Sequence, residues 1–245
     1  KKEVLDRILK TLEGTPAGTA TETRKDSQRV APPLFDLTSL QKEANRKLGF
    51  SARRTLQAAQ KLYESYKLLT YPRTDSKALP EDYKGVVPKV VDYLGQSSAY
   101  KAPAKTLKET GLQNQARNFN DKAVSDHFAI IPTGEGDFSG LSGDVAKIFV
   151  LVVRRFLASF HPPAIITEVE RITTVSEESF RTRKSVLKVP GWRAVDGRET
   201  EDPLAALPPL PEGTTQVTKA SHEVDEKETQ PPGRINEGQL LGMTE

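Results

Sequence analysis

The residue types best suited to chemistry lie close together between Leu68 and Ser76, in the sequence LLTYPRTDS. A tyrosine hydroxyl has a pKa of about 10 and is a weak nucleophile near neutral pH, so it needs a neighbouring cation or base. Arg73 follows Tyr71 by two residues, and Pro72 favours an extended backbone for the residue before it. In a short strand, both side chains would leave the same face. The spacing therefore predicts that Tyr71 and Arg73 bind one phosphate group.

The six residues YPRTDS, starting at Tyr71, resemble the catalytic signature of the type IA DNA topoisomerases, and the proline is most like that of the topoisomerase III branch. Three further stretches resemble the same family and follow its order along the chain. They are PPLFDLTSLQ at 32–41, AQKLYE at 59–64 and DHFAIIPT at 126–133. One short match would be weak, but four motifs in order are hard to obtain by accident.

The resemblance implies a role for each matching residue. Tyr71 would attack a phosphodiester of single-stranded DNA, giving a 5′-phosphotyrosyl link and a free 3′-hydroxyl, while Arg73 and His127 bind the phosphate. Another strand would pass through the opening, and the 3′-hydroxyl would reverse the reaction without ATP. The expected DNA-binding residues around this catalytic group are Gln60, Glu64, Thr70, Thr74, Asp75 and Ser76.

The resemblance also implies that part of the machinery lies outside this chain. No Asp-x-Asp-x-Glu cluster occurs in the 245 residues, and oxygen ligands are what Mg²⁺ requires. The family holds Mg²⁺ in an N-terminal Toprim domain. Because the chain also begins without a methionine or an apolar signal region, we interpret it as an excised fragment. We expect it to bind no cofactor, to need the Toprim and base domains as partners, and to be unable to relax DNA alone.

Each of these residues also has an ordinary structural interpretation. Thr74, Asp75 and Ser76 are typical of a turn or a helix cap, Gln60 and Glu64 of a polar helix face, and a single histidine beside an apolar run of a structural role. Two other functions therefore stay open. One is a non-enzymatic module in which Tyr71 stacks on a base of single-stranded DNA. The other is a tyrosine recombinase, whose dispersed Arg and His residues cannot be placed in this sequence.

Charge is distributed unevenly along the chain. The net charge is only +3, but residues 42–73 contain eight Lys/Arg against two Glu, whereas residues 194–245 contain eleven Asp/Glu against four Lys/Arg. The basic run coincides with the tyrosine motif, which favours phosphate binding and adds Arg53 and Arg54 to the expected DNA contacts. The acidic run includes Glu223, Asp225, Glu226 and Glu228 near His222, which we interpret as a flexible charged stretch and not as a metal site.

The composition is compatible with a reducing interior. It has no cysteine, and its longest apolar run, residues 148–153, is far shorter than the roughly 20 residues that cross a bilayer. We expect a soluble, cytoplasmic, nucleoid-associated protein that is a monomer and has no membrane partner.

Periodicity predicts helices over 3–12, 38–48, 51–63, 83–94 and 143–160. In the second helix, Thr38 and Gln41 are expected to form a capping box at the start, and Gly49 is expected to end it. Ser51 is expected to cap the third helix, and Pro88 to bend or split the fourth. It predicts strands over 15–30, 165–170, 180–189, 192–195 and 217–224. Residues 95–125 show little periodicity and are expected to be loop with short helical pieces. The helices over 38–48 and 51–63 fit either a plain hairpin or a helix-turn-helix.

We therefore predict a multidomain α+β fold in which a helical, winged-helix-like catalytic-tyrosine domain is inserted into a β-rich hinge domain. The expected boundaries are 1–35 and 163–230 for the two hinge segments, 36–162 for the tyrosine domain and 231–245 for the start of a return to a base domain. The resemblance implies that the hinge domain carries the tyrosine domain as a movable gate.

Overall fold

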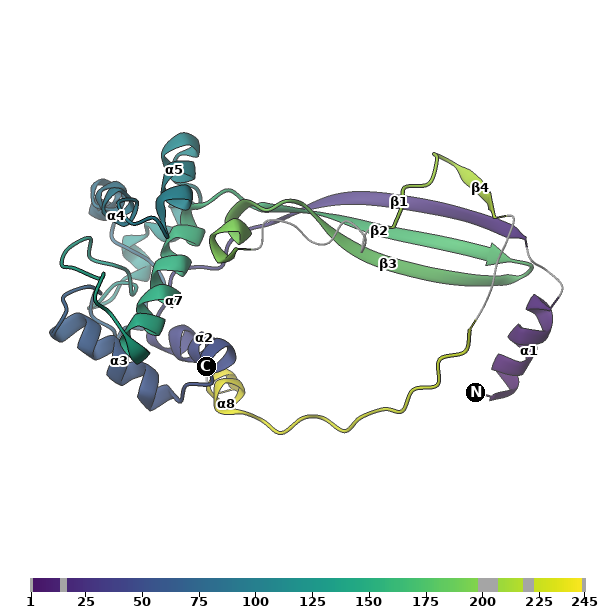
Figure 1. Ribbon diagram of the computed structural model, residues 1–245, viewed down its shortest axis with the longest axis horizontal. Coiled ribbons are helices and arrows are strands. Elements are labelled where there is room, and N and C mark those ends of the chain that lie inside the picture. Colours follow the sequence, from purple (N-terminus) through teal and green to yellow (C-terminus); the bar gives the residue numbers. More distant parts are fainter. Residues whose placement is uncertain (1, 14–16, 198–206, 218–222, 244–245) are drawn as a thin grey trace. The chain divides into compact units, whose positions relative to one another are not determined.

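The computed structural model describes residues 2–13, 17–197, 207–217 and 223–243, and its chain forms two compact units (Figure 1). The first unit comprises Lys1–Arg29, Ala164–Pro190 and Glu199–Pro232, and the second comprises Val30–Pro163, Gly191–Arg198 and Gly233–Glu245. The described residues thus form a mixture of α-helices and one antiparallel sheet. The winged-helix likeness and the insertion of one domain into another stay predictions.

The first unit is built on a four-stranded antiparallel sheet. Its strands are β1 (Gly18–Arg29), β2 (Ala164–Val175), β3 (Glu178–Val189) and β4 (Thr214–Val217), in the order β3-β2-β1-β4, and α1 (Lys2–Leu12) precedes β1. The register runs from Thr19 opposite Thr174 to Arg29 opposite Ala164. Charged pairs cross neighbouring strands: Glu22 of β1 accepts from Arg171 of β2 at 2.6 Å, and Arg183 of β3 pairs with Glu170 of β2 at 2.7 Å. Such cross-strand pairs stabilise a sheet that has few buried side chains.

Two of the expected strands differ from the structure. Residues 192–195 do not continue β3, because Pro190 cannot donate to the ladder and the chain turns at Gly191 (φ 51°) into the 3₁₀ helix η3 (Gly191–Asp196). Where a strand is predicted over 217–224, the structure has β4, which ends at Val217, the first residue of that prediction. Residues 218–222, including His222, lie outside the described part of the chain. The helix over 3–12 and the strand over 180–189 are confirmed, and the strand predicted over 15–30 is confirmed over Gly18–Arg29.

The second unit is helical. Its helices are α2 (Leu37–Leu48), α3 (Ala52–Glu64), η1 (Glu81–Gly85), α4 (Val87–Leu94), α5 (Lys101–Thr110), α6 (Gln115–Asn118), η2 (Asp121–Ala123), α7 (Gly143–Phe160), η3 and α8 (Glu237–Met243). The apolar stripe of α7 is buried as predicted, with Phe149, Phe156 and Phe160 among the most buried side chains. Helices α2, α3, α5 and η3 contact α7, so α7 is the centre of this core. The loop expected over 95–125 is wrong in part, because α5 is a full helix that buries Ala104 and Leu107.

The caps of α2 and α3 fix the turn between them. The N-cap of α2 is Asp36 and not Thr38: its side chain accepts from the Ser39 amide at 2.7 Å, and Ser39 completes the capping box. Asp36 prevails because its carboxylate is buried beside Lys77 (3.2 Å), a contact that sequence spacing does not show. Gly49 ends α2 in the left-handed conformation and Ser51 caps α3, as predicted. Pro88 stands in the first turn of α4, and the fourth helix is split as expected.

A Gly49→Ala substitution tests the turn between α2 and α3. Gly49 has φ +67°, and an added Cβ would meet no atom within 4 Å, so only backbone strain opposes it. We expect the free energy of unfolding to fall by about 1–2 kcal/mol. Urea denaturation followed by circular dichroism measures this. Gly85 is the matched control, since it has equal space and no positive φ, and Gly85→Ala should be neutral or slightly stabilising. Equal effects of both substitutions would contradict the strain argument.

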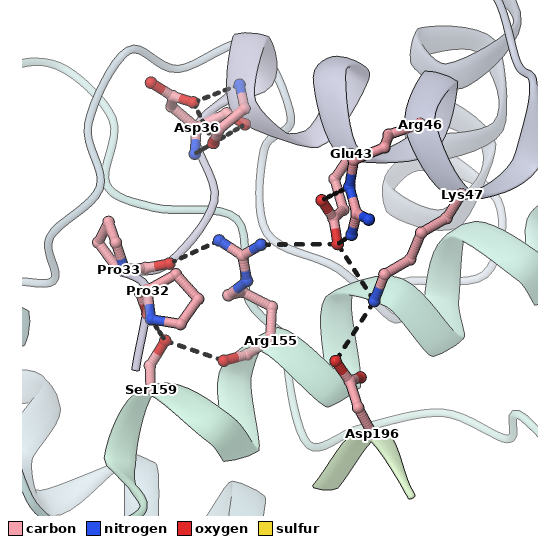
Figure 2. Close-up of polar contacts among 10 residues, drawn as sticks. Pro32, Pro33, Asp36, Glu43, Arg46, Lys47, Arg155, Ser159 and Asp196 are labelled. Carbon is pink, nitrogen blue, oxygen red and sulfur yellow. Dashed lines mark hydrogen bonds and ion pairs between the residues drawn. The ribbon is translucent and has the colours of Figure 1, made fainter. Parts of the chain in front are cut away.

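A polar network joins four segments of the second unit (Figure 2). Arg155 of α7 donates to the Pro33 carbonyl at 3.1 Å and lies 3.9 Å from Glu43 of α2. Ser159, one turn further along α7, donates to the Pro32 carbonyl at 3.0 Å. Lys47 bridges Glu43 (3.1 Å) and Asp196 of η3 (3.4 Å). The network fixes the start of α2 and the η3 segment against α7.

Glu43 makes this network sensitive to acid. Burial raises the pKa of its carboxyl, but the hydrogen bonds from Arg46 and Lys47 more than offset it, and the pKa lies below its usual value. A lowered folded-state pKa means that the stabilisation is present above the unfolded value of about 4.3 and is lost as pH falls through the folded pKa. We expect Glu43→Gln to destabilise the chain at pH 7 and to make its urea midpoint less dependent on pH below about 4.3. Parallel curves for the wild type and Glu43→Gln would refute this.

Candidate active site

Two motifs that lie about sixty residues apart in the sequence are joined by backbone hydrogen bonds. Thr70 N donates to the Ile131 carbonyl at 3.0 Å, and Thr133 N donates to the Leu68 carbonyl at 3.1 Å. The Thr70 side chain adds two bonds, one to the Ala129 carbonyl and one from the Ile131 amide, both 2.9 Å. Leu68, Leu69 and the apolar run 129–131 are buried. Burial of apolar residues on both sides therefore fixes where Tyr71 and His127 emerge.

The regular pairing ends at Thr70, so the expectation that Tyr71 and Arg73 share one face of a short strand is wrong. Residues 71–76 have no strand assignment. Pro72 has no N–H to donate to a ladder, and the next backbone anchor is the bond from Leu37 N to the Thr74 carbonyl at 3.0 Å. Tyr71 and Arg73 are held instead by different side-chain partners.

The ring of Tyr71 is half-buried between two other rings. Its centroid lies 4.3 Å from that of His127, with the planes tilted by 46°, and 5.4 Å from that of Tyr63 in an edge-to-face arrangement at 76°. Lys67 Nζ lies 5.8 Å from the centroid of the Tyr63 ring. Aromatic pairs of this geometry are favourable beyond the area they bury. The two ring contacts thus fix the orientation of the Tyr71 side chain, and its neighbour His127 is exposed to solvent.

Arg73 is positioned by Gln60 of α3. With the Gln60 amide oriented so that its oxygen faces the guanidinium, Oε1 accepts from Nη2 at 3.0 Å and from Nε at 3.1 Å. This contact leaves other N–H groups of the exposed guanidinium available, since arginine has five. Gln60 and Tyr63 are three residues apart and therefore neighbours on the same face of α3. One helix face thus supports both Tyr71 and Arg73.

The hydroxyls of Thr74 and Ser76 are used inside the protein. Thr74 Oγ1 donates to the His127 carbonyl at 2.9 Å, and Ser76 Oγ donates to the Ala123 carbonyl at 2.7 Å; both residues are less than a tenth exposed. Asp75 is exposed and accepts from Ser125 at 3.3 Å. These bonds fasten the tyrosine segment to the histidine segment. A direct DNA contact by Thr70, Thr74, Asp75 or Ser76 stays a prediction.

The remaining predicted DNA-binding residues make no ion pair or side-chain hydrogen bond with this group in the described part of the chain. Arg54 makes a bidentate pair with Asp144 at 2.7 Å and lies 4.0 Å over the Phe50 ring. Arg53 and Glu64 are exposed on α3, and their side chains form no ion pair or hydrogen bond among the described residues. Their DNA contacts also stay predictions.

Tyr63 is the side chain whose place at the site sequence reasoning missed. The helical spacing of Leu56, Ala59, Leu62 and Tyr63 predicts that Tyr63 belongs to a buried stripe of α3, yet its ring is only half-buried and contacts Tyr71. The sequence signal for its place at the site is the spacing of three residues from Gln60, which puts both side chains on one face of the helix.

The described residues contain no group of three or more His, Asp or Glu side chains that could hold a metal ion. Among the same residues, no helix combines the length and the apolar character needed to cross a bilayer.

Comparisons with known proteins agree with the motifs. The family model described as DNA topoisomerase matches residues 1–245. DNA topoisomerase 3 of Bacillus subtilis (strain 168) is 37% identical over 253 residues, covering 100% of this chain and 34% of that protein. DNA topoisomerase 3 of Shouchella clausii (strain KSM-K16) is 40% identical over 226 residues, covering 90% of this chain and 30% of that protein. A solved structure of full-length topoisomerase I from Thermotoga maritima aligns with a TM-score of 0.63 and 25% identity, covering 97% of this chain and 39% of that one.

The chain belongs to the type IA DNA topoisomerase family. Within that family it is most like topoisomerase III, the branch that Pro72 indicates. It spans about a third of the length of the curated relatives that it matches.

Proposed function

We propose that this chain is the tyrosine-bearing part of a topoisomerase that transiently cleaves single-stranded DNA, passes a strand and reseals the cut, relaxing negative supercoils or unlinking DNA without ATP. The observation that carries the proposal is the grouping around Tyr71: a half-exposed phenol against His127, with a guanidinium held by Gln60 two residues further on. Phosphoryl transfer needs a nucleophile in line and positive charge on the non-bridging oxygens. The three side chains supply both.

In the proposed reaction, the Tyr71 oxygen attacks phosphorus and loses its proton, while the bond from phosphorus to the 3′ oxygen breaks. The 3′ oxygen takes up a proton and leaves as a hydroxyl, and the 5′ phosphate stays on Tyr71. Arg73 donates to the non-bridging oxygens, and His127 donates to a phosphate oxygen when it is protonated. Because the phosphoester bond is kept in the link to Tyr71, attack by the 3′-hydroxyl restores the strand without ATP.

The described residues contain no group of three or more acidic or histidine side chains that could hold Mg²⁺. We propose that a Toprim domain elsewhere in the full-length polypeptide holds Mg²⁺, and that this domain and the base domain are the partners of the chain, together with single-stranded DNA. The enzyme would act as a monomer in the cytoplasm, on nucleoid DNA. The chain by itself would not relax DNA.

The experiment is covalent trapping with a full-length topoisomerase that contains this chain. A single-stranded oligonucleotide is labelled at its 3′ end in one sample and at its 5′ end in another, and the protein is denatured during the reaction. Only the 3′ label should remain on the protein, since the 5′ piece leaves with a free 3′-hydroxyl. Peptide mapping should place the label on Tyr71. Retention of the 5′ label, or an adduct on another residue, would overturn the proposal.

A second candidate function is a binding module without catalysis. Tyr63, Tyr71 and His127 form a cluster of three rings with one exposed member, and bases of single strands stack on such clusters. In this case the oligonucleotide with either label would bind, but no covalent adduct would survive denaturation of the protein.

A further inference from the structure

A pocket of about 260 Å³ lies in the second unit, and it shares no lining residue with the group around Tyr71. Helices α2, α7 and η3 and the segment at Pro32 form its walls, and Phe35, Leu151 and Ala158 provide apolar lining. The volume is several times the roughly 30 Å³ that one water molecule occupies in the liquid. The pocket can therefore take a group much larger than a solvent molecule.

The walls of the pocket are rich in positive charge. Five cationic side chains line it, Arg46, Lys47, Arg154, Arg155 and Arg193, against two carboxylates, Glu43 and Asp196. The carboxylates are already used: Glu43 accepts from Arg46 at 2.8 Å and from Lys47 at 3.1 Å, and Lys47 also reaches Asp196. Arg154 is exposed, and no carboxylate of the described residues pairs with it. A recess with an excess of three positive charges attracts an anion.

Among these cations, Arg155 has a guanidinium that is held in place by the surrounding protein, and Figure 2 shows it between Pro33 and Glu43. Its guanidinium is held by the Pro33 carbonyl at 3.1 Å and lies 4.1 Å over the Phe35 ring, and its side chain is only 16% exposed. Glu43, at 3.9 Å, is too distant to accept a hydrogen bond from it. A planar guanidinium fixed in this way loses little freedom on binding a phosphate.

One aromatic residue completes the lining. Trp192, the second residue of η3, is the single tryptophan of the chain. Indole rings stack on bases with little dependence on sequence. A ring beside a cationic recess is the combination by which proteins bind single strands.

We propose that this pocket is a second nucleic-acid site, which binds a phosphate group through Arg154 and Arg155 and an adjoining base through Trp192. The source of the phosphate is either a DNA strand or a free nucleotide. The inference rests on the proposed function only in taking DNA as the strand that is bound.

The single tryptophan allows a direct test on this chain. Its fluorescence is titrated with a short oligothymidylate, with thymidine monophosphate and with inorganic phosphate, each at several salt concentrations. We expect saturable quenching by the oligonucleotide that weakens as salt rises. Equal quenching by the monophosphate would assign the pocket to free nucleotides; much weaker quenching would assign it to a strand. No saturable change with any probe would overturn the proposal.

Arg154→Gln is the decisive variant, because Arg154 is exposed and its removal leaves the network of Arg155 intact. It should weaken binding and lower the slope of log affinity against log salt by about one. Lys101→Gln, which removes an exposed charge from α5 outside the pocket, is the matched control and should change neither. If Arg154→Gln behaves like Lys101→Gln, the pocket does not bind the phosphate.

Tyr71→Phe separates this site from the proposed active site. Quenching of Trp192 should persist in Tyr71→Phe, and an adduct should still form in a full-length enzyme with Arg154→Gln. If quenching is lost in Arg73→Ala but retained in Arg154→Gln, the signal arises from binding at the Tyr71 group, and the inference is overturned. Failure of adduct trapping would leave the titration result unaffected.

Discussion

Tyr71→Phe is expected to abolish the covalent protein–DNA adduct and to reduce strand cleavage by at least about 10⁴-fold, because it removes the oxygen that forms the ester in the proposed reaction. The substitution deletes one oxygen and keeps the ring. The contacts of that ring with His127 and Tyr63 are therefore retained, and the fold should be unchanged. The measurement is adduct yield in a full-length topoisomerase that contains this chain, with circular dichroism to confirm the fold.

Tyr63→Phe is the matched control for that experiment. Tyr63 lies edge to face with Tyr71 and loses the same atom on substitution, yet in our interpretation its hydroxyl does no chemistry. Adduct formation should stay within a few fold of the wild type. If Tyr63→Phe abolishes the adduct and Tyr71→Phe does not, the nucleophile has been assigned to the wrong ring.

Arg73→Ala should have the second-largest effect, a loss of about 10²–10³-fold in the cleavage rate at saturating DNA, comparable to the removal of one group that stabilises charge in a transition state. Gln60→Ala should reduce the cleavage rate less than Arg73→Ala does. It leaves the guanidinium in place and removes only the oxygen that accepts from its Nη2 at 3.0 Å and from its Nε at 3.1 Å. Because Gln60 acts through Arg73, the double variant should be little worse than Arg73→Ala alone.

The alternative for Arg73 is a contact that only helps binding. In that case Arg73→Ala would raise the DNA concentration needed for half-maximal cleavage and leave the rate at saturation unchanged. Fully additive losses in the double variant would show that Gln60 acts independently of Arg73.

The sequence predicted elements where periodicity and caps were strong. Helix α7 has an unbroken apolar stripe, and Gly49 and Ser51 carry local signals that no tertiary contact overrides. The boundary at Asp36 was missed because its burial beside Lys77 depends on segments far away in the sequence. Helix α5 was missed because its buried stripe consists of only Ala104 and Leu107.

For the candidate site, the motifs identified the residues but not their contacts. Period-two spacing placed Tyr71 and Arg73 on one strand face, whereas Pro72 ends the pairing and each side chain finds its own partner. The contact between Tyr71 and His127 depends on the pairing of residues 68–70 with 131–133, which no local pattern shows. The roles of these residues on DNA stay predictions.

Tyr71, the proposed nucleophile, and its neighbours Arg73, His127 and Gln60 all belong to the continuous stretch Val30–Pro163 of one compact unit. In the proposed reaction, a severed strand esterified to Tyr71 would therefore stay beside Arg73, His127 and Gln60 if that unit moved. The 5′ end of the cut strand would keep its position relative to these side chains. Only the 3′ end would then have to return before the strand is rejoined.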